Sequence, residues 1–81
     1  MNTFTTTGTC SRAINFEVED NIITHVDFVG GCSGNTQGVS RLIEGMNIHD
    51  AINKIEGIKC GVRNTSCPDQ LAKALKEYLN R

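Results

Sequence analysis

The sequence predicts an α+β fold in which a three-stranded antiparallel sheet is followed by three helices packed on one face. Two observations predict it: apolar and polar residues alternate in the N-terminal part, and helical spacing with capping signals follows from residue 35 onward. The 81 residues suffice for one domain, residues 1–81, and for only a small core. A domain of this size buries about 60% of its unfolded surface, so additional cross-links would stabilise it.

The first strand is expected at residues 3–7, the second shows its alternation from Ala13 to Glu19, and the third begins its alternation after Asp20-Asn21. Apolar residues alternate in the second and third strands: Ile14, Phe16 and Val18, then Ile22, Val26 and Phe28. A hairpin centred on Asp20, pairing Ile14 with Val26, puts both apolar sets on one face. We expect this register and reject a two-residue turn, which would leave one set in water.

Two helices are expected between the sheet and residue 57. Asn35 or Thr36 caps the first, and Gly45 lies near its end. Its expected apolar stripe is Val39, Leu42, Ile43 and Met46. Asn47, with Asp50, opens the second helix, and Gly57 ends it. Its apolar residues at helical spacing are Ile48, Ile52 and Ile55.

The last helix is expected from Cys67 to about Leu79, and its start carries the most distinctive sequence. Ser66 is a good N-cap, Pro68 is tolerated in the first turn, and Asp69 can bond back to the cap. Cys67 therefore occupies the first helical position. Free amides and the helix dipole favour a thiolate there, which is the form that binds metals.

Four cysteines, at positions 10, 32, 60 and 67, are expected to converge. Cys10 begins the second strand and Cys32 ends the third, so the hairpin places both at one end of the sheet. Cys67 starts a helix that returns to that end, and Cys60 can reach it from a connector. Four thiolates suit zinc or an iron–sulfur cluster. Disulfide pairing and buried free thiols are the alternatives, and a reducing compartment weighs against the first.

Composition restricts the partners. The net charge is −1, and a protein that binds phosphates needs a basic surface, so nucleic acid is not expected as a partner. No apolar run suggests a signal peptide or a membrane span, and a cytoplasmic location is expected. His25 and His49 are interpreted as surface histidines, because neither maps to the cysteine end.

The segment Asn64-Thr65-Ser66-Cys67-Pro68-Asp69 resembles the signature of the TSCPD-domain family. With Cys10, Cys32 and Cys60, the chain looks like the small four-cysteine members of that family. The resemblance covers nearly the whole chain and implies a metal-binding domain. The same domain is found at the C-terminus of some ribonucleotide reductases, so a ribonucleotide reductase is an expected partner.

A more distant resemblance is to iron–sulfur scaffold proteins of the IscU and NifU type, and it implies a SufE/NifU-like fold. Cys10, Cys32 and Cys67 match the scaffold cysteines in order. The chain differs in Arg12, where the scaffolds have aspartate, and in Ser66, where histidine often stands. Cys60 is an addition.

These observations predict a metal-binding accessory module with Cys10, Cys32, Cys60 and Cys67 as ligands and without independent catalysis. The cofactor is zinc or an iron–sulfur cluster, and the sequence leaves the choice open. An iron–sulfur scaffold or carrier, working with an iron–sulfur assembly protein, is the first alternative. A thiol redox protein is the second. Whether the apolar stripes support a homodimer also stays open.

Overall fold

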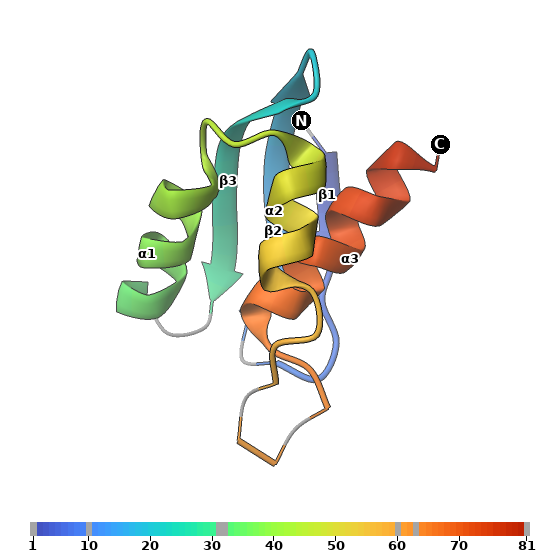
Figure 1. The fold of residues 1–81 in the computed structure, drawn as a ribbon. Helices are drawn as coiled ribbons and strands as arrows, with labels where there is room; N and C mark the ends of the chain where they lie inside the picture. The colour runs from blue at the N-terminus through green and yellow to red at the C-terminus, as the bar shows by residue number, and fades with distance from the viewer. Residues whose placement is uncertain (1, 10, 31–32, 60, 63, 81) are drawn as a thin grey trace.

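Three antiparallel strands precede three helices in the computed structural model (Figure 1). The structure describes residues 2–9, 11–30, 33–59, 61–62 and 64–80. The elements are β1 (Asn2–Thr5), β2 (Ser11–Glu19), β3 (Ile22–Gly30), α1 (Ser33–Ile43), α2 (Ile48–Ile55) and α3 (Cys67–Leu79). The strand order is β1-β2-β3, and both pairs are antiparallel. The predicted α+β class and order of elements are therefore confirmed.

The β2–β3 hairpin differs from its predicted register. Phe16, not Ile14, pairs with Val26, and Ile14 pairs with Phe28. Glu19 pairs with Ile22, so the turn has only two residues, Asp20 and Asn21. Their φ angles are 50° and 65°. Positive φ at both central residues is typical of the type I′ turn, whose twist matches that of the flanking strands. The two-residue turn rejected from the sequence is therefore present.

A β-bulge at Thr24 explains why the parity argument failed. Glu17 pairs with His25 but Val18 pairs with Ile23, which leaves Thr24 as an extra residue on β3. Its hydroxyl donates to the Glu17 carbonyl at 3.3 Å. One extra residue reverses the side-chain parity of a strand. Ile23 is therefore buried and Ile22 is exposed, although the sequence pattern predicted the reverse.

One face of the sheet forms the core with the helices. The buried apolar residues of the strands are Ile14, Phe16, Ile23 and Val26, and those of the helices are Ile43, Ile48, Ala51, Ile52, Ile55, Leu71, Ala72, Ala74 and Leu75. Tyr78 of α3 packs edge-to-face on Phe16, with ring centroids 6.1 Å apart. On the opposite face, which is partly exposed to solvent, Asn15 pairs with Thr3 on β1 and with Asp27 on β3.

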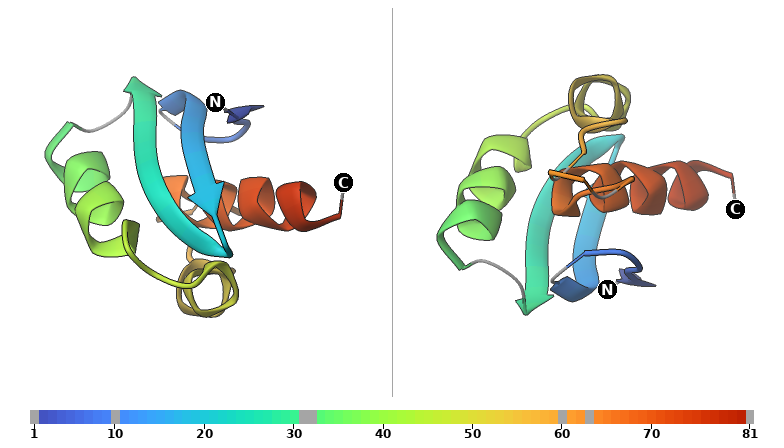
Figure 2. Two further views of the ribbon diagram at one scale, coloured as in Figure 1. Left: turned by 90° about the horizontal axis from the view of Figure 1, so that it is seen from above. Right: turned by 90° about the horizontal axis from the view of Figure 1, so that it is seen from below.

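The helices differ in how well the sequence predicted their faces. Asn47 caps α2 by accepting from the His49 amide, and the predicted isoleucine stripe of α2 is buried. In α1, the predicted stripe is wrong at Leu42, whose side chain is 78% exposed, because α1 turns Thr36 and Ser40 toward β3 instead. α1 lies beside β3, while α2 and α3 pack on each other (Figure 2).

Among the described residues, no helix combines the length and apolar character that crossing a bilayer requires.

Candidate functional site

The start of α3 forms as the sequence predicts. Ser66 has an extended backbone, and its Oγ accepts a hydrogen bond from the Asp69 amide at 3.2 Å. Pro68 lies in the first turn, where its missing N–H leaves no intrahelical bond unmade. The Ser66 hydroxyl also donates to the Ile58 carbonyl at 2.6 Å. The cap therefore fixes both the helix start and the connector that precedes it.

The Asp69 carboxylate has a different role from the predicted capping box. It accepts hydrogen bonds from the Thr65 hydroxyl at 2.5 Å and the Gly57 amide at 2.7 Å. The side-chain amide of Gln70 donates to Thr65 Oγ1 at 3.0 Å, and its oxygen accepts from the Thr7 amide at 3.2 Å. This polar network ties the β1–β2 loop and the end of α2 to the first turn of α3.

The network also sets the charge state of Asp69. Burial opposes ionisation and by itself raises the pKa of this carboxyl. The hydrogen bonds from Thr65 and Gly57 and the charge of Lys73 outweigh burial, so the pKa of Asp69 lies below its ordinary value. Asp69 is therefore an ionised structural anchor, although its carboxylate bonds to Thr65 and Gly57 rather than back to the Ser66 cap as the sequence predicted.

Gly8 shows how closely the β1–β2 loop approaches this helix start. Its φ is +73°, and a Cβ there would lie 3.0 Å from the Thr65 methyl carbon. Both the backbone conformation and the close approach favour glycine. Gly8, Thr9, Asn64 and Thr65 line a shallow depression on the surface here.

Cys67 lies against the start of β2. Its side chain is buried, and Ser11 Oγ is 3.3 Å from Cys67 Sγ. Ser11 is also buried, and Thr9 Oγ1 lies 3.1 Å from Ser11 Oγ. A hydroxyl at this distance can donate to a sulfur that carries negative charge. The first residue of β2 and the first residue of α3 thus meet at one end of the sheet.

The predicted ligands Cys10, Cys32 and Cys60 lie outside the described residues, so their convergence with Cys67 stays a prediction. Within the described ranges, no group of three or more histidine, cysteine or acidic side chains is placed to hold a metal ion.

The histidines agree with their interpretation as surface residues. His25 is exposed on β3, with Nδ1 3.6 Å from Glu44 Oε2. His49 is exposed in the first turn of α2.

Three residues of the site were not identified from the sequence: Ser11, Thr65 as a network member, and Gln70. Ser11 could have been identified because it follows Cys10 in the sequence. Thr65 could have been identified because it belongs to the Thr-Ser-Cys-Pro-Asp segment. A glutamine in an amphipathic helix gives no such signal, because the amide that donates to Gln70 belongs to Thr7, far away in the sequence.

Comparison with known families gives one match. The TSCPD domain matches residues 2–79, which is nearly the whole chain. No curated protein and no solved structure matches. The expected likeness to SufE/NifU-type folds therefore remains a prediction.

Proposed function

Because the chain belongs to the TSCPD-domain family, we propose that it is a metal-binding accessory domain with Cys10, Cys32, Cys60 and Cys67 as ligands. The metal is zinc or the iron of an iron–sulfur cluster. The proposed partner is a ribonucleotide reductase, since this domain occurs at the C-terminus of some of those enzymes. The domain would support such an enzyme rather than catalyse a reaction itself.

The contact between Ser11 and Cys67 carries the proposal. Cys67 Sγ is 3.3 Å from Ser11 Oγ, and Ser11 directly follows Cys10 in the sequence. This contact supports the pairing of Cys10 and Cys67 in one site.

Two described residues, each two positions before Cys32 or Cys60 in the sequence, contact the same end of the sheet and of α3 and so support a shared site there. Gly30 pairs with Ser11 across the hairpin and stands two residues before Cys32. Ile58 accepts a hydrogen bond from Ser66, and it stands two residues before Cys60. The flanking residues therefore come from β2, β3 and the α2–α3 connector, as a four-ligand site at this end requires.

The donor chemistry suits these metals. Four thiolates form a closed tetrahedral site for zinc, which contributes directly to folding stability. Cysteine thiolates are also the usual ligands of iron–sulfur clusters. When bound, the metal would cross-link the sheet, the connector and α3. The Ser11 hydroxyl would donate to the Cys67 thiolate and orient it, while Ser66 and Asp69 hold the helix start in place.

Anaerobic purification followed by elemental analysis and an absorption spectrum tests the proposal. About one zinc per chain and no visible absorption indicates a structural zinc site. A brown protein that loses its colour in air indicates a cluster and favours the scaffold or carrier function. Cys67→Ser should reduce the metal content, whereas His49→Ala, which alters a potential ligand elsewhere, should not. Native protein without metal, together with unchanged thermal stability when all four cysteines are replaced by serine, would refute the proposal.

A further inference from the structure

β3 is an edge strand, and its outer edge carries backbone groups that point away from β2. The Val26 amide donates to Glu44 Oε2 at 2.9 Å, so this amide faces outward. Backbone groups alternate in direction along a strand. The amide and carbonyl of Phe28, two residues on, therefore face the same way as those of Val26.

The chain begins a fourth strand beside β3 but does not complete it. At the start of β3, the Ile23 amide donates to the Met46 carbonyl at 2.9 Å, and the Gly45 amide donates to the Ile23 carbonyl at 2.7 Å. Ile22 and Asn47 form an antiparallel bridge. At Val26, the Glu44 carboxylate accepts the hydrogen bond from the backbone amide, which a carbonyl of a fourth strand would otherwise accept. In the part of the chain that the structure describes, no segment takes the fourth-strand position beside Phe28.

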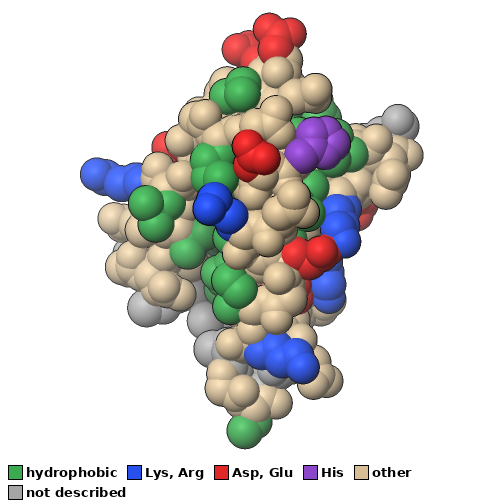
Figure 3. All heavy atoms as spheres, in the orientation of Figure 1, with side chains coloured by type: hydrophobic (Ala, Val, Ile, Leu, Met, Phe, Trp, Pro, Cys, Tyr) green, Lys and Arg blue, Asp and Glu red, His purple; other side chains and the backbone are tan. Residues whose placement is uncertain are grey.

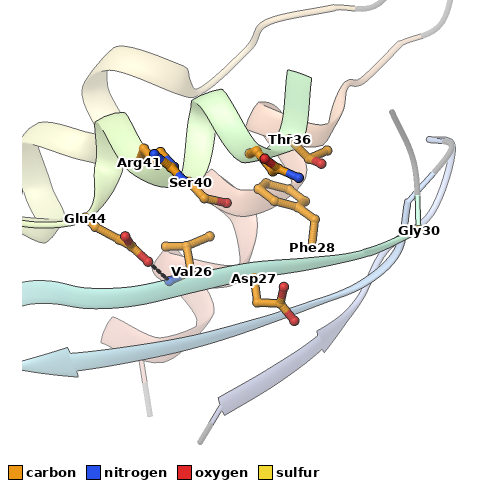
Figure 4. A pocket seen from close by; sticks show the side chains of 9 residues that line it. Val26, Asp27, Phe28, Gly30, Thr36, Ser40, Arg41 and Glu44 are labelled. Atoms are coloured by element: carbon orange, nitrogen blue, oxygen red, sulfur yellow. Dashed lines mark hydrogen bonds between the residues drawn. The ribbon is translucent and has the colours of Figure 1, made fainter. Parts of the chain in front are cut away.

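A groove occupies that position, between β3 and α1 (Figure 4). The side chains of Val26 and Phe28 point toward α1, and the helix contributes Thr36 and Ser40 to the opposite wall (Figure 4). Thr36 and Ser40 are small residues that line the groove, and both are largely buried. The groove thus combines an outward-facing strand edge with a helix wall made of small side chains.

We propose that this groove binds an extended peptide segment of a partner protein, which adds to β3 as a fourth strand. The segment runs antiparallel to β3, in continuation of the pairing that residues 45–47 begin. Its backbone exchanges hydrogen bonds with Phe28, as in other cases where a peptide extends a sheet edge. Alternate side chains of an added strand point to opposite faces, so each face of the groove selects its own residue type.

The charges around the groove define the peptide further. Small apolar side chains suit the face toward Phe28, Thr36 and Ser40. On the other face, Asp27 points away from α1 and is exposed, so it favours a lysine or arginine beside it (Figure 4). With Glu44 on the groove, the acidic residues outnumber Arg41, the single cation among the described lining residues. The partner segment is therefore a basic strand that alternates small apolar residues with lysine or arginine.

Hydrogen exchange of single amides, measured by NMR, tests this proposal with a short synthetic peptide that alternates lysine and valine. Peptide at about ten times its Kd should slow exchange of the Phe28 amide about tenfold. The Asp27 amide faces β2 and is the internal control, since its exchange should not depend on the peptide. A version of the peptide with N-methylated backbone amides keeps the side chains but cannot pair, and it should give no protection.

Charge reversal provides a second arm. Asp27→Lys should weaken binding of the lysine–valine peptide and favour a glutamate–valine peptide, whereas Asp50→Lys, an exposed change on α2, should do neither. Three results would overturn the proposal: no protection of Phe28 at millimolar peptide, equal binding of the N-methylated peptide, or protection of Phe28 that rises with protein concentration alone. The last result would assign the edge to a second copy of the chain. Gly30 lines the groove and also pairs with Ser11 beside the proposed metal site, so the peptide measurements are made at one fixed metal content.

Discussion

Replacing Asp69 by alanine tests whether the buried polar network stabilises the start of α3. The Gly57 amide and the Thr65 hydroxyl would lose an ionised acceptor at 2.7 and 2.5 Å. A hydrogen bond to a charged group contributes about 1.5–3 kcal/mol. Gly57 is exposed, so water can replace the carboxylate there, whereas Thr65 is buried and stays desolvated. We therefore expect Asp69→Ala to lower the free energy of unfolding by about 3 kcal/mol.

The same effect should depend on pH in a defined direction. The pKa of Asp69 in the folded protein is below its ordinary value, so the unfolded chain binds the proton more readily. The stabilisation from Asp69 is therefore fully present above the unfolded pKa of about 4. It is lost as the pH falls through the lower folded pKa. Acidification should therefore reduce the difference in stability between the wild type and Asp69→Ala.

Urea unfolding followed by far-UV circular dichroism, at matched metal content, measures both effects. Asp50→Ala is the matched control, because Asp50 also lies in the first turn of a helix but is exposed. Its loss should be about 0.5 kcal/mol, from the helix dipole alone. Equal losses in the two variants would refute a role for the buried network. A difference between wild type and Asp69→Ala that does not decrease at low pH would contradict the lowered pKa of Asp69.

Three further changes test the fold by the same unfolding measurement. Ser66→Ala removes the acceptor for the Asp69 amide and should cost about 1–2 kcal/mol; a loss within error would contradict the capping role. Leu71→Ala empties a fully buried site and should cost about 2–5 kcal/mol, whereas Leu42→Ala, at an exposed position, should stay within about 0.5 kcal/mol. Equal losses at these two leucines would contradict the observed face of α1. Asn21→Val places a β-branched residue at φ 65° and should cost about 1–2 kcal/mol, whereas Asn21→Gly should cost nothing.

Local signals predicted the helices more reliably than the hairpin. Ser66 and Asn47 cap α3 and α2 as expected, because a cap depends on residues within one turn. The predicted cap of α1 at Asn35 or Thr36 is wrong, since α1 begins at Ser33. The predicted hairpin register was wrong because Thr24 is an extra residue on β3. The alternation of apolar and polar residues in β3 does not mark Thr24 as extra. Asp20-Asn21 is also not the Asn-Gly or Asp-Gly pair that most strongly predicts a two-residue turn. A pattern of period two cannot reveal a single inserted residue unless the turn is known independently.

The candidate site was predictable as a position rather than as a set of contacts. Cys67 at the start of a helix follows from its neighbours in the sequence. Its contact with Ser11, and that of Gln70 with Thr7, join residues 56 and 63 positions apart. Such contacts depend on how β2 and α3 pack, which no local pattern encodes. The exposure of Leu42 has the same kind of cause. Helical spacing placed Leu42 on the apolar stripe, but the rotation of α1 against β3 decides which residues are buried.

These long separations have a consequence for the order of folding. Closing a loop of this length lowers the entropy of the chain before the contact that closes it can form. Contacts between residues far apart in the sequence therefore tend to form late. The β2–β3 hairpin can form from adjacent residues, but the surroundings of Cys67 need both ends of the chain at once. A growing chain would complete its strands before this thiol has a neighbour. A ligand that binds only to this end of the sheet after it has assembled can therefore bind only when the whole domain has folded.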